Sequence, residues 1–396
     1  MILNYMWKYI SGWSNYSGKV ISHVINESIM GNRGSKCDKA HALPLKEQRV
    51  DGSWYGSGAP YLRCTLMGNE NYYQVRILSN LKSNLRNFSS TANHTIAKLS
   101  PEFVTGFTDA EGTFGIPLTK REDKNISWQV RLEFKIELHV QDLELLYKIK
   151  KFFNDKGSIN ISKTRNTARF RITSLEDILN YVIPHFDNYP MHTQKQGDFL
   201  LFRKAGMLMK NKKHLNPNGL QEIINIKATS NLGLNNTIKE SFPNTSPVVR
   251  PVVVPRDISP YWMAGFVSGD GGFNIALGRV RVGSNRRGIR LFFIITQHVK
   301  DTRLINSFKE YFNCGGFISS KNAIVYRVTD QVSVSKVIIP FFTKYNVQGK
   351  KYDDFTNWVK ISNLIDNKEH LTQSGYEKII NIKGLMNKSR LKEFKS

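Results

Sequence analysis

Short runs of hydrophobic and polar residues that are typical of β-strands occur twice along the chain, in the same order. They span 128–138, 159–162 and 168–173 in the first half, and 289–297, 317–319 and 324–328 in the second. Stretches with a helical pattern lie between and after them, at about 140–153, 175–182, 195–209, 301–312, 331–338 and 351–364. Helices interleaved with pairs of strands predict an α+β fold with antiparallel sheets.

The two series of predicted elements form an internal repeat. The Ser-Pro pair at residues 100–101 recurs as 259–260, and the offset of 159 residues also matches Gly157 with Gly316. The segment Ile-Ile-Asn-Ile-Lys at residues 223–227 then recurs 156 residues later. One change of offset across about 130 residues indicates a duplicated domain, which is too long for a solenoid repeat.

The repeat predicts four segments: an N-terminal extension (1–97), a first domain (98–230), a linker (231–257) and a second domain (258–396). The extension has no counterpart in the repeat. The linker contains four prolines, and proline resists both helix and central strand. A semi-extended linker is therefore expected between the two domains.

The composition indicates a polyanionic partner. The 396 residues carry a formal net charge of +25, which favours nucleic acid first and an anionic membrane surface second. No run of 18 apolar residues occurs, so no transmembrane span is expected. The three cysteines, Cys37, Cys64 and Cys314, are scattered and odd in number, which predicts neither a disulfide framework nor a zinc site.

The first 26 residues contain no Asp or Glu, and two interpretations of them stay open. Such a composition is typical of a mitochondrial transit peptide. It is equally typical of a tail rich in Asn, Ser and Lys that is encoded in an organelle reading frame.

Each copy is predicted to open with a helix that pairs with its counterpart. Ser100 and Ser259 are suitable N-caps, and each is followed by a proline at the first helical position. Small residues lie four apart on each helix, at Gly106 and Ala110 in one and at the equivalent glycines 265 and 269 in the other. Such a face lets two helix backbones approach closely, which favours pairing across a pseudo-two-fold axis.

Each opening helix is expected to end in a carboxylate, Glu111 in the first copy and Asp270 in the second, just before Gly112 and Gly271. A negative charge at a helix C-terminus opposes the helix dipole, so something should compensate it. If the helices pair, the two carboxylates lie together and either share a proton or bind a hard cation, for which Mg²⁺ is the natural candidate. Asp109, two residues before Glu111, is interpreted as a local structural group.

The motifs at residues 104–112 and 263–271 resemble the nine-residue LAGLIDADG signature, and the resemblance covers about 98–390. It implies two pseudo-symmetric αββαββα domains, paired through the motif helices, with antiparallel sheets that bind DNA. It implies a site-specific endonuclease for double-stranded DNA, in which the eighth motif residue of each copy, Glu111 or Asp270, binds a catalytic Mg²⁺ that Mn²⁺ can replace.

The resemblance also implies basic residues near the two carboxylates. Lys195 and Lys351 lie at the matching positions, with Lys350 as a close alternative to Lys351. A polar residue able to hold a metal-bound water is present as Gln297 in the second copy, whereas Leu138 takes its place in the first. This asymmetry predicts unequal rates for the two strand cuts. The repeated histidines at positions 139 and 298 are interpreted as structural.

Basic side chains on the predicted strands are candidates for contacts in the major groove, where Arg can read guanine and Lys can bind phosphate. A face with many Arg and few acids is expected, formed by Arg131, Lys135, Arg169, Arg171, Arg279, Arg281, Arg287, Arg290 and Arg327. Because the two copies differ at these positions, the expected target is long and asymmetric and is bound by a monomer.

The basic surface is also compatible with functions other than DNA cleavage. An RNA maturase that assists splicing of its own intron, alone or in addition to the nuclease, would use the same basic surface to bind intron RNA. A protein that only binds DNA would have lost the catalytic acids, which are kept here. A membrane partner is not expected, because it would leave the duplicated acidic motif unexplained. The Asn- and Ile-rich composition is typical of fungal mitochondrial intron-encoded proteins, which predicts a mitochondrial location.

Overall fold

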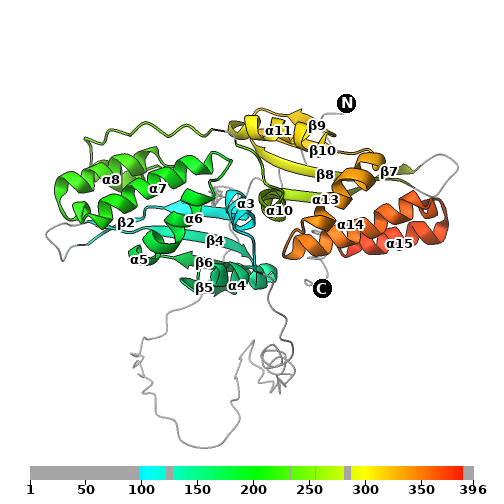
Figure 1. Cartoon of the computed structure of the whole chain (residues 1–396), viewed down its shortest axis with the longest axis horizontal. Coiled ribbons are helices and arrows are strands. Elements are labelled where there is room, and N and C mark those ends of the chain that lie inside the picture. The colour runs from blue at the N-terminus through cyan, green and yellow to red at the C-terminus, as the bar shows by residue number, and fades with distance from the viewer. Residues whose placement is uncertain (1–97, 122–127, 232, 255, 281–286, 387–396) are drawn as a thin grey trace, which may run out of the picture. The chain divides into compact units, whose positions relative to one another are not determined.

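A computed structural model describes residues 98–121, 128–231, 233–254, 256–280 and 287–386, which all belong to one compact unit (Figure 1). The N-terminal extension, with Cys37, Cys64 and the predicted transit peptide or tail, lies outside the described residues. Within the described part, no helix is long and apolar enough to cross a membrane.

The first copy contains α3 (Pro101–Glu111), β1 (Gly112–Gly115), β2 (Leu118–Lys120), β3 (Trp128–Val130), β4 (Glu133–His139), α4 (Leu143–Phe152), β5 (Ser158–Ser162), β6 (Thr167–Ile172), α5 (Leu175–Asp177), α6 (Ile183–Asn188), α7 (Lys195–Lys210), α8 (Pro217–Thr229) and α9 (Asn236–Ser241). The second contains α10 (Pro260–Asp270), β7 (Gly271–Val280), β8 (Arg287–His298), α11 (Thr302–Phe312), β9 (Gly316–Ser319), β10 (Ala323–Val328), α12 (Gln331–Ser333), α13 (Ile339–Lys344), α14 (Lys350–Asp366) and α15 (Gln373–Gly384).

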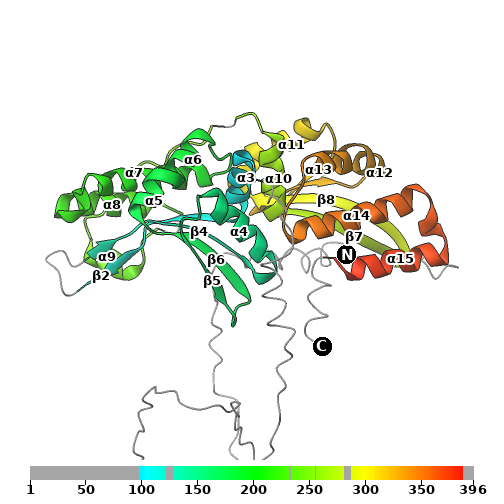
Figure 2. The same cartoon turned by 60° about the horizontal axis from the view of Figure 1, so that its bottom comes forward.

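Each copy is built around a four-stranded antiparallel sheet with the same strand order. The orders are β1-β4-β6-β5 and β7-β8-β10-β9, and β2 pairs separately with β3. Figure 2 shows α5 and α6 on one side of strands β4, β5 and β6. The α+β class and the antiparallel sheets are as predicted.

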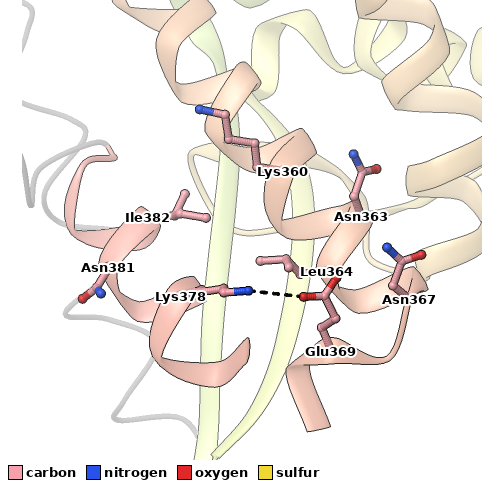
Figure 3. Close-up of a pocket in the computed structure, with 8 residues that line it drawn as sticks. All are labelled: Lys360, Asn363, Leu364, Asn367, Glu369, Lys378, Asn381 and Ile382. Carbon is pink, nitrogen blue, oxygen red and sulfur yellow. Dashed lines mark ion pairs between the residues drawn. The ribbon is translucent and has the colours of Figure 1, made fainter. Parts of the chain in front are cut away.

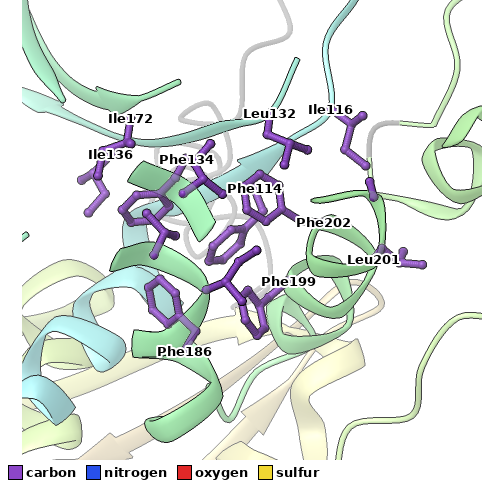
Figure 4. Close-up of a cluster of buried hydrophobic side chains, with 14 of the residues drawn as sticks. Phe114, Ile116, Leu132, Phe134, Ile136, Ile172, Phe186, Phe199, Leu201 and Phe202 are labelled. Atoms are coloured by element: carbon purple, nitrogen blue, oxygen red, sulfur yellow. The ribbon is translucent and has the colours of Figure 1, made fainter. Parts of the chain in front are cut away.

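The side of the first sheet that faces the helices is an aromatic core. Phe134 of β4 and Phe170 of β6 are fully buried, because alternate residues of a strand point to the same face. The ring of Phe114 lies 5.3 Å from that of Phe134 and 5.2 Å from that of Phe186 on α6, between sheet and helices (Figure 4). Full burial of each phenylalanine stabilises the fold by about 2 kcal/mol. These contacts therefore hold the helices of the first copy, including α3, against its sheet.

Several predicted elements need correction. The run 128–138 forms two strands, β3 and β4, and the first strands β1 and β7 were not predicted at all. The helix expected at 175–182 continues through a π-helical turn (Ile178–Val182) into α6, despite the proline that follows. The Ile183 N–H bonds to the carbonyl oxygen of Ile178, so the hydrogen-bond register of the helix changes just before the proline, which has no N–H to donate.

The C-terminal part of each copy also holds helices that were not predicted. α8 and α15 contain the repeated Ile-Ile-Asn-Ile-Lys segment, and α9 lies within the predicted linker, ahead of its first proline. Residues 246–254, which include Pro247 and Pro251, form neither helix nor strand.

The repeat register also changes earlier than the sequence suggested. Gly157 and Gly315 both have positive φ, 81° and 79°, and both precede the edge strand of their sheet. A Cβ on Gly157 would overlap the carbonyl oxygen of Arg171, and one on Gly315 would meet that of Arg327. Gly315, not Gly316, is therefore the structural equivalent of Gly157.

Candidate active site

The two motif helices α3 and α10 cross in direct backbone contact, side by side between the two sheets (Figure 1, Figure 2). A Cβ on Gly106 would overlap the carbonyl oxygen of Trp262, and one on Gly265 would overlap that of Phe103. A Cβ on Gly269 would overlap the methyl group of Ala110. The small residues thus have the predicted role of bringing two helix backbones together.

Both motif helices begin and end where the sequence predicts. Ser100 accepts a hydrogen bond from the Phe103 N–H (3.1 Å), and Ser259 caps α10. Gly112 and Gly271 follow the last helical residues, but both are extended and not left-handed. They are glycines because a Cβ would overlap side-chain atoms of the preceding helical turn, Thr108 in one copy and Val267 in the other.

Helix pairing brings Glu111 and Asp270 together. Burial, followed by repulsion from Asp270, raises the pKa of Glu111 to about 7. Burial likewise raises the pKa of Asp270, and the ammonium group of Lys195 opposes this shift. Two neighbouring carboxyl groups with raised pKa values hold a proton more readily than isolated ones, and a cation between them would displace it.

Two lysines approach the same helix ends. Lys195 Nζ donates to the carbonyl oxygens of Thr108 (2.9 Å) and Ala110 (3.1 Å), and Lys351 Nζ donates to that of Gly271. Burial lowers the pKa of both lysines, and nearby carboxylates oppose the shift. These cations supply the compensation that acidic helix C-termini require.

Lys350, the alternative to Lys351, is placed differently. Its Nζ forms an ion pair with Asp353 (2.9 Å), and its side chain is 43% exposed. The structure therefore brings Lys351, and not Lys350, to the end of a motif helix.

The two copies differ where a polar residue was expected next to the carboxylates. Gln297, at the end of β8, donates its amide N–H to Asp270. Leu138 of β4 is instead a partly buried member of the first core. The asymmetry expected from the sequence is therefore present in the contacts of the site.

Asp109 has the structural role expected of it. Its carboxylate accepts hydrogen bonds from His192 N (2.8 Å), Thr193 Oγ1 (2.6 Å) and the indole of Trp262 (2.8 Å). Burial raises its pKa to about 6 even with these donors. The sequence did not single out Thr193 or Trp262, because neither shows a pattern that predicts this contact.

The repeated histidines are structural, as predicted. His139 Nδ1 accepts a hydrogen bond from Gln141 N (3.3 Å), and His298 Nδ1 accepts one from Lys300 N (3.2 Å). Each histidine thereby caps the short 3₁₀ turn that follows β4 in the first copy or β8 in the second.

Three predicted DNA-binding residues share the open face of the first sheet. Because Phe134 and Phe170 face the core, Lys135, Arg169 and Arg171 point to the other side. Arg131 lies between β3 and β4, exposed, and donates to Gln129 (3.1 Å).

Acidic residues lie on the same face. Arg169 forms two hydrogen bonds to Glu137 (2.7 and 2.9 Å), and Lys135 lies 3.7 Å from Glu133. The expectation of a face with few acids is therefore too simple, since two of its cations are already paired. Arg171 is the exposed cation of this group.

In the second sheet, Arg290 of β8 is exposed, and Arg327 of β10 stacks over the ring of Phe292, 4.6 Å from its centroid. Strand β7 contains Arg279 and β8 contains Arg287, but their side chains lie outside the described part, as does Arg281 altogether.

The donor set fits a hard divalent cation. Among the described residues no group of three or more His, Cys, Asp and Glu side chains is placed to hold a metal ion. Glu111 and Asp270 offer two carboxylates, which is the usual protein share for Mg²⁺ when phosphate and water complete the shell.

Two surface pockets of the described residues lie away from this site. One is formed between α14 and α15, where Lys378 and Glu369 form an ion pair at 3.7 Å (Figure 3). A second surrounds the start of α8. None of the predicted site residues lines either pocket.

Comparisons with known proteins agree with this arrangement. A family model described as LAGLIDADG endonuclease matches residues 104–206 and 263–362. The chain is 38% identical over 391 residues to "Probable intron-encoded endonuclease 3" of Neurospora crassa, covering 94% of this chain and 73% of the relative. It is 36% identical to "Probable intron-encoded endonuclease 2" of the same organism, covering 75% and 69%.

Solved structures show the same fold. I-SmaMI bound to uncleaved DNA target in the presence of calcium ions has a TM-score of 0.71 and 38% identity, covering 73% of this chain and 99% of that chain. The LAGLIDADG homing endonuclease I-GzeII in complex with DNA target has a TM-score of 0.68 and 42% identity, covering 74% and 99%.

Proposed function

Because the chain belongs to the LAGLIDADG endonuclease family, we propose that it cuts both strands of double-stranded DNA at one long, specific site. The observation that carries the proposal is the meeting of Glu111 and Asp270 at the ends of two paired helices, flanked by Lys195 and Lys351. Carboxylates and ammonium groups gathered at one place in a protein of net charge +25 are suited to phosphodiester hydrolysis.

Glu111 and Asp270 would hold Mg²⁺, with Mn²⁺ as a substitute. When bound, the metal would polarise the scissile phosphate and stabilise the leaving oxygen. Glu111 must lose its proton to serve as a ligand, and a pKa of about 7 allows this at neutral pH. Gln297 orients Asp270 through its amide N–H.

Lys195 and Lys351 would neutralise the negative charge that develops at the scissile phosphate. Each is held by main-chain carbonyl oxygens at the end of a motif helix, so its position does not depend on DNA. Burial lowers the pKa of each ammonium group, which favours proton exchange with water near the reacting phosphate. The remaining alternative role is a plain contact with DNA phosphate.

The open sheet faces would lie in the major groove. Arg169 and Arg171 in the first copy correspond to Val325 and Arg327 in the second, so the two faces offer different side chains to bases. We therefore expect an asymmetric target that is bound by a single chain, which carries both copies.

The biological setting follows from the relatives. The curated proteins named above are described as intron-encoded, and others come from fungi such as Podospora anserina and Schizosaccharomyces pombe. We infer a role in intron homing and a mitochondrial location. An RNA maturase activity on intron RNA is not favoured, since the two relatives are named as probable endonucleases and the two solved structures contain DNA.

The test begins with the full chain and a library of random duplexes. Duplexes bound in Ca²⁺ are cloned into plasmids and incubated with Mg²⁺, Mn²⁺ or EDTA. One linear product in Mg²⁺ and Mn²⁺, and none in EDTA, is expected. Cutting in EDTA would contradict the metal role, and tighter binding of structured RNA than of any duplex would favour the maturase.

A further inference from the structure

We propose that Asp142 and Asp301 are positioning residues, each of which fixes the start of the lysine-bearing helix of the opposite copy. The proposal rests on the endonuclease function for its catalytic consequence, but the contacts themselves are independent of it. The two aspartates occupy equivalent places in the repeat, at the end of the 3₁₀ turn that follows β4 or β8.

Asp142 reaches from the first copy into the second. Its Oδ1 accepts a hydrogen bond of 2.7 Å from the N–H of Lys350, the first residue of α14, across 208 positions of sequence. The neighbouring residue Gly349 has φ +66°, and a Cβ there would overlap the same carboxylate oxygen. The glycine therefore leaves the space that the carboxylate occupies.

Asp301 makes the matching contact in the other direction. Its Oδ1 accepts a hydrogen bond of 2.7 Å from the N–H of Gln194, the N-cap residue of α7. α7 begins with Lys195, just as Lys351 is the second residue of α14. Each aspartate thus accepts from the backbone N–H of the residue directly before a lysine of the site.

In neither lysine-bearing helix does the N-cap residue itself supply a side-chain cap, although in α7 the Oγ1 of Thr193 accepts a hydrogen bond of 3.1 Å from the N–H of Lys195. The N-cap residues Gln194 and Gly349 accept no capping hydrogen bond with their side chains. By contrast, in α3, α8, α10 and α15 the side chain of the N-cap residue accepts a hydrogen bond from a backbone N–H of the first turn. The unsatisfied N–H groups at a helix start are stabilised by a carboxylate, both by hydrogen bonding and through the dipole.

The crossed caps have a consequence for catalysis. A shift of a helix start moves its lysine relative to the carboxylates, and a displacement of about 1 Å at a reacting centre can cost about 100-fold in rate. Because each cap crosses the copy boundary, the first copy contributes to the placement of Lys351 and the second copy contributes to that of Lys195. The two strand cuts are therefore coupled through the interface.

The experiment compares Asp142→Ala and Asp301→Ala in the full chain. The Asn variants keep an acceptor oxygen and serve as conservative replacements. Asp330→Ala is the matched control, because Asp330 also accepts a 2.7 Å hydrogen bond from a backbone N–H, but within its own copy. Backbone hydrogen exchange without DNA is measured at residues 193–199 and 349–355.

Asp142→Ala should raise exchange at 349–355 by about 10-fold or more and leave 193–199 unchanged, while Asp301→Ala does the reverse. Each Asn variant should restore most of the protection. Equal changes in both segments, or the same pattern in Asp330→Ala, would overturn the proposal. This readout needs no cleavage, so it separates failure of the proposal from failure of the endonuclease function.

Strand-resolved single-turnover cleavage then tests the catalytic consequence. The strand slowed most by Asp142→Ala should be the one slowed most by Lys351→Met, and Asp301→Ala should follow Lys195→Met. Both effects should appear in the rate of cutting and not in DNA affinity in Ca²⁺. A uniform slowing of both strands by each aspartate variant would refute the crossed arrangement.

Discussion

Trp262 of the second motif helix donates its indole N–H to the carboxylate of Asp109 on the first, at 2.8 Å. Asp109 also holds the segment that leads into α7 through His192 and Thr193. One buried acid therefore joins both copies to the helix that carries Lys195.

This contact predicts energetic coupling between the two residues. Asp109→Ala and Trp262→Phe should each lower the free energy of unfolding, and the double variant should lose about 1–3 kcal/mol less than the sum of the two. Urea unfolding of the four proteins measures the coupling. Strictly additive losses would show that the hydrogen bond contributes nothing.

Close packing of the motif helices predicts a large penalty for one methyl group. Gly265→Ala should lower the free energy of unfolding by about 1–3 kcal/mol, because the added carbon would overlap the carbonyl oxygen of Phe103. Gly384→Ala is the control, since a Cβ there meets no atom within 4 Å. Thermal unfolding distinguishes them, and equal melting temperatures would contradict the close crossing.

The raised pKa of Glu111 predicts how metal-free stability depends on pH. Folding raises this pKa from 4.5 to about 7, so the folded protein keeps a proton that the unfolded chain releases. The associated stability is fully present below pH 4.5 and is lost as pH rises to about 7. Asp109, with a pKa raised to about 6, adds a loss in the same direction.

Melting temperatures in EDTA from pH 4 to 8 should therefore fall more for the wild type than for Glu111→Gln. At pH 8, Mg²⁺ should restore the wild type and leave the variant unchanged. Identical pH profiles for the two proteins would show that Glu111 titrates normally.

The placement of two adjacent lysines predicts different effects of removing them. Lys351→Met should slow DNA cleavage by about 100-fold or more, because its ammonium group lies at the end of α10. Lys350→Met loses an exposed ion pair with Asp353 and should change the rate by less than about 3-fold. The cleavage rates of the two variants are compared under single-turnover conditions at saturating enzyme. A larger loss of rate in Lys350→Met than in Lys351→Met would make Lys350 the active-site residue.

The sequence predicted the parts of the site that depend on local pattern. Ser100 and Gly112 mark the helix ends, and the spacing of Gly106 and Ala110 marks the paired face. The carboxylates and lysines follow from the repeat together with the family resemblance. Each of these signals is contained in a short segment, or in the recurrence of such a segment, so it can be recognised without knowing how distant segments meet.

The remaining features depend on tertiary contacts. Asp142 and Lys350 are 208 positions apart, and nothing in either segment predicts that they meet. Likewise, the pairing of Arg169 with Glu137 depends on strand register. The strands β1 and β7 were missed because each begins with glycine directly after a helix, although Phe114 and Phe273 recur as buried residues within them.

The most direct test of the central claim is strand-resolved cleavage by Glu111→Gln and Asp270→Asn, with Glu310→Gln, an exposed acid of α11, as control. Binding to the selected duplex is measured in parallel in Ca²⁺. Both site variants should bind DNA and fail to make the double-strand break in Mg²⁺, while the control cuts at the wild-type rate. Double-strand cutting by either site variant at the wild-type rate would contradict the assignment of these two carboxylates to catalysis.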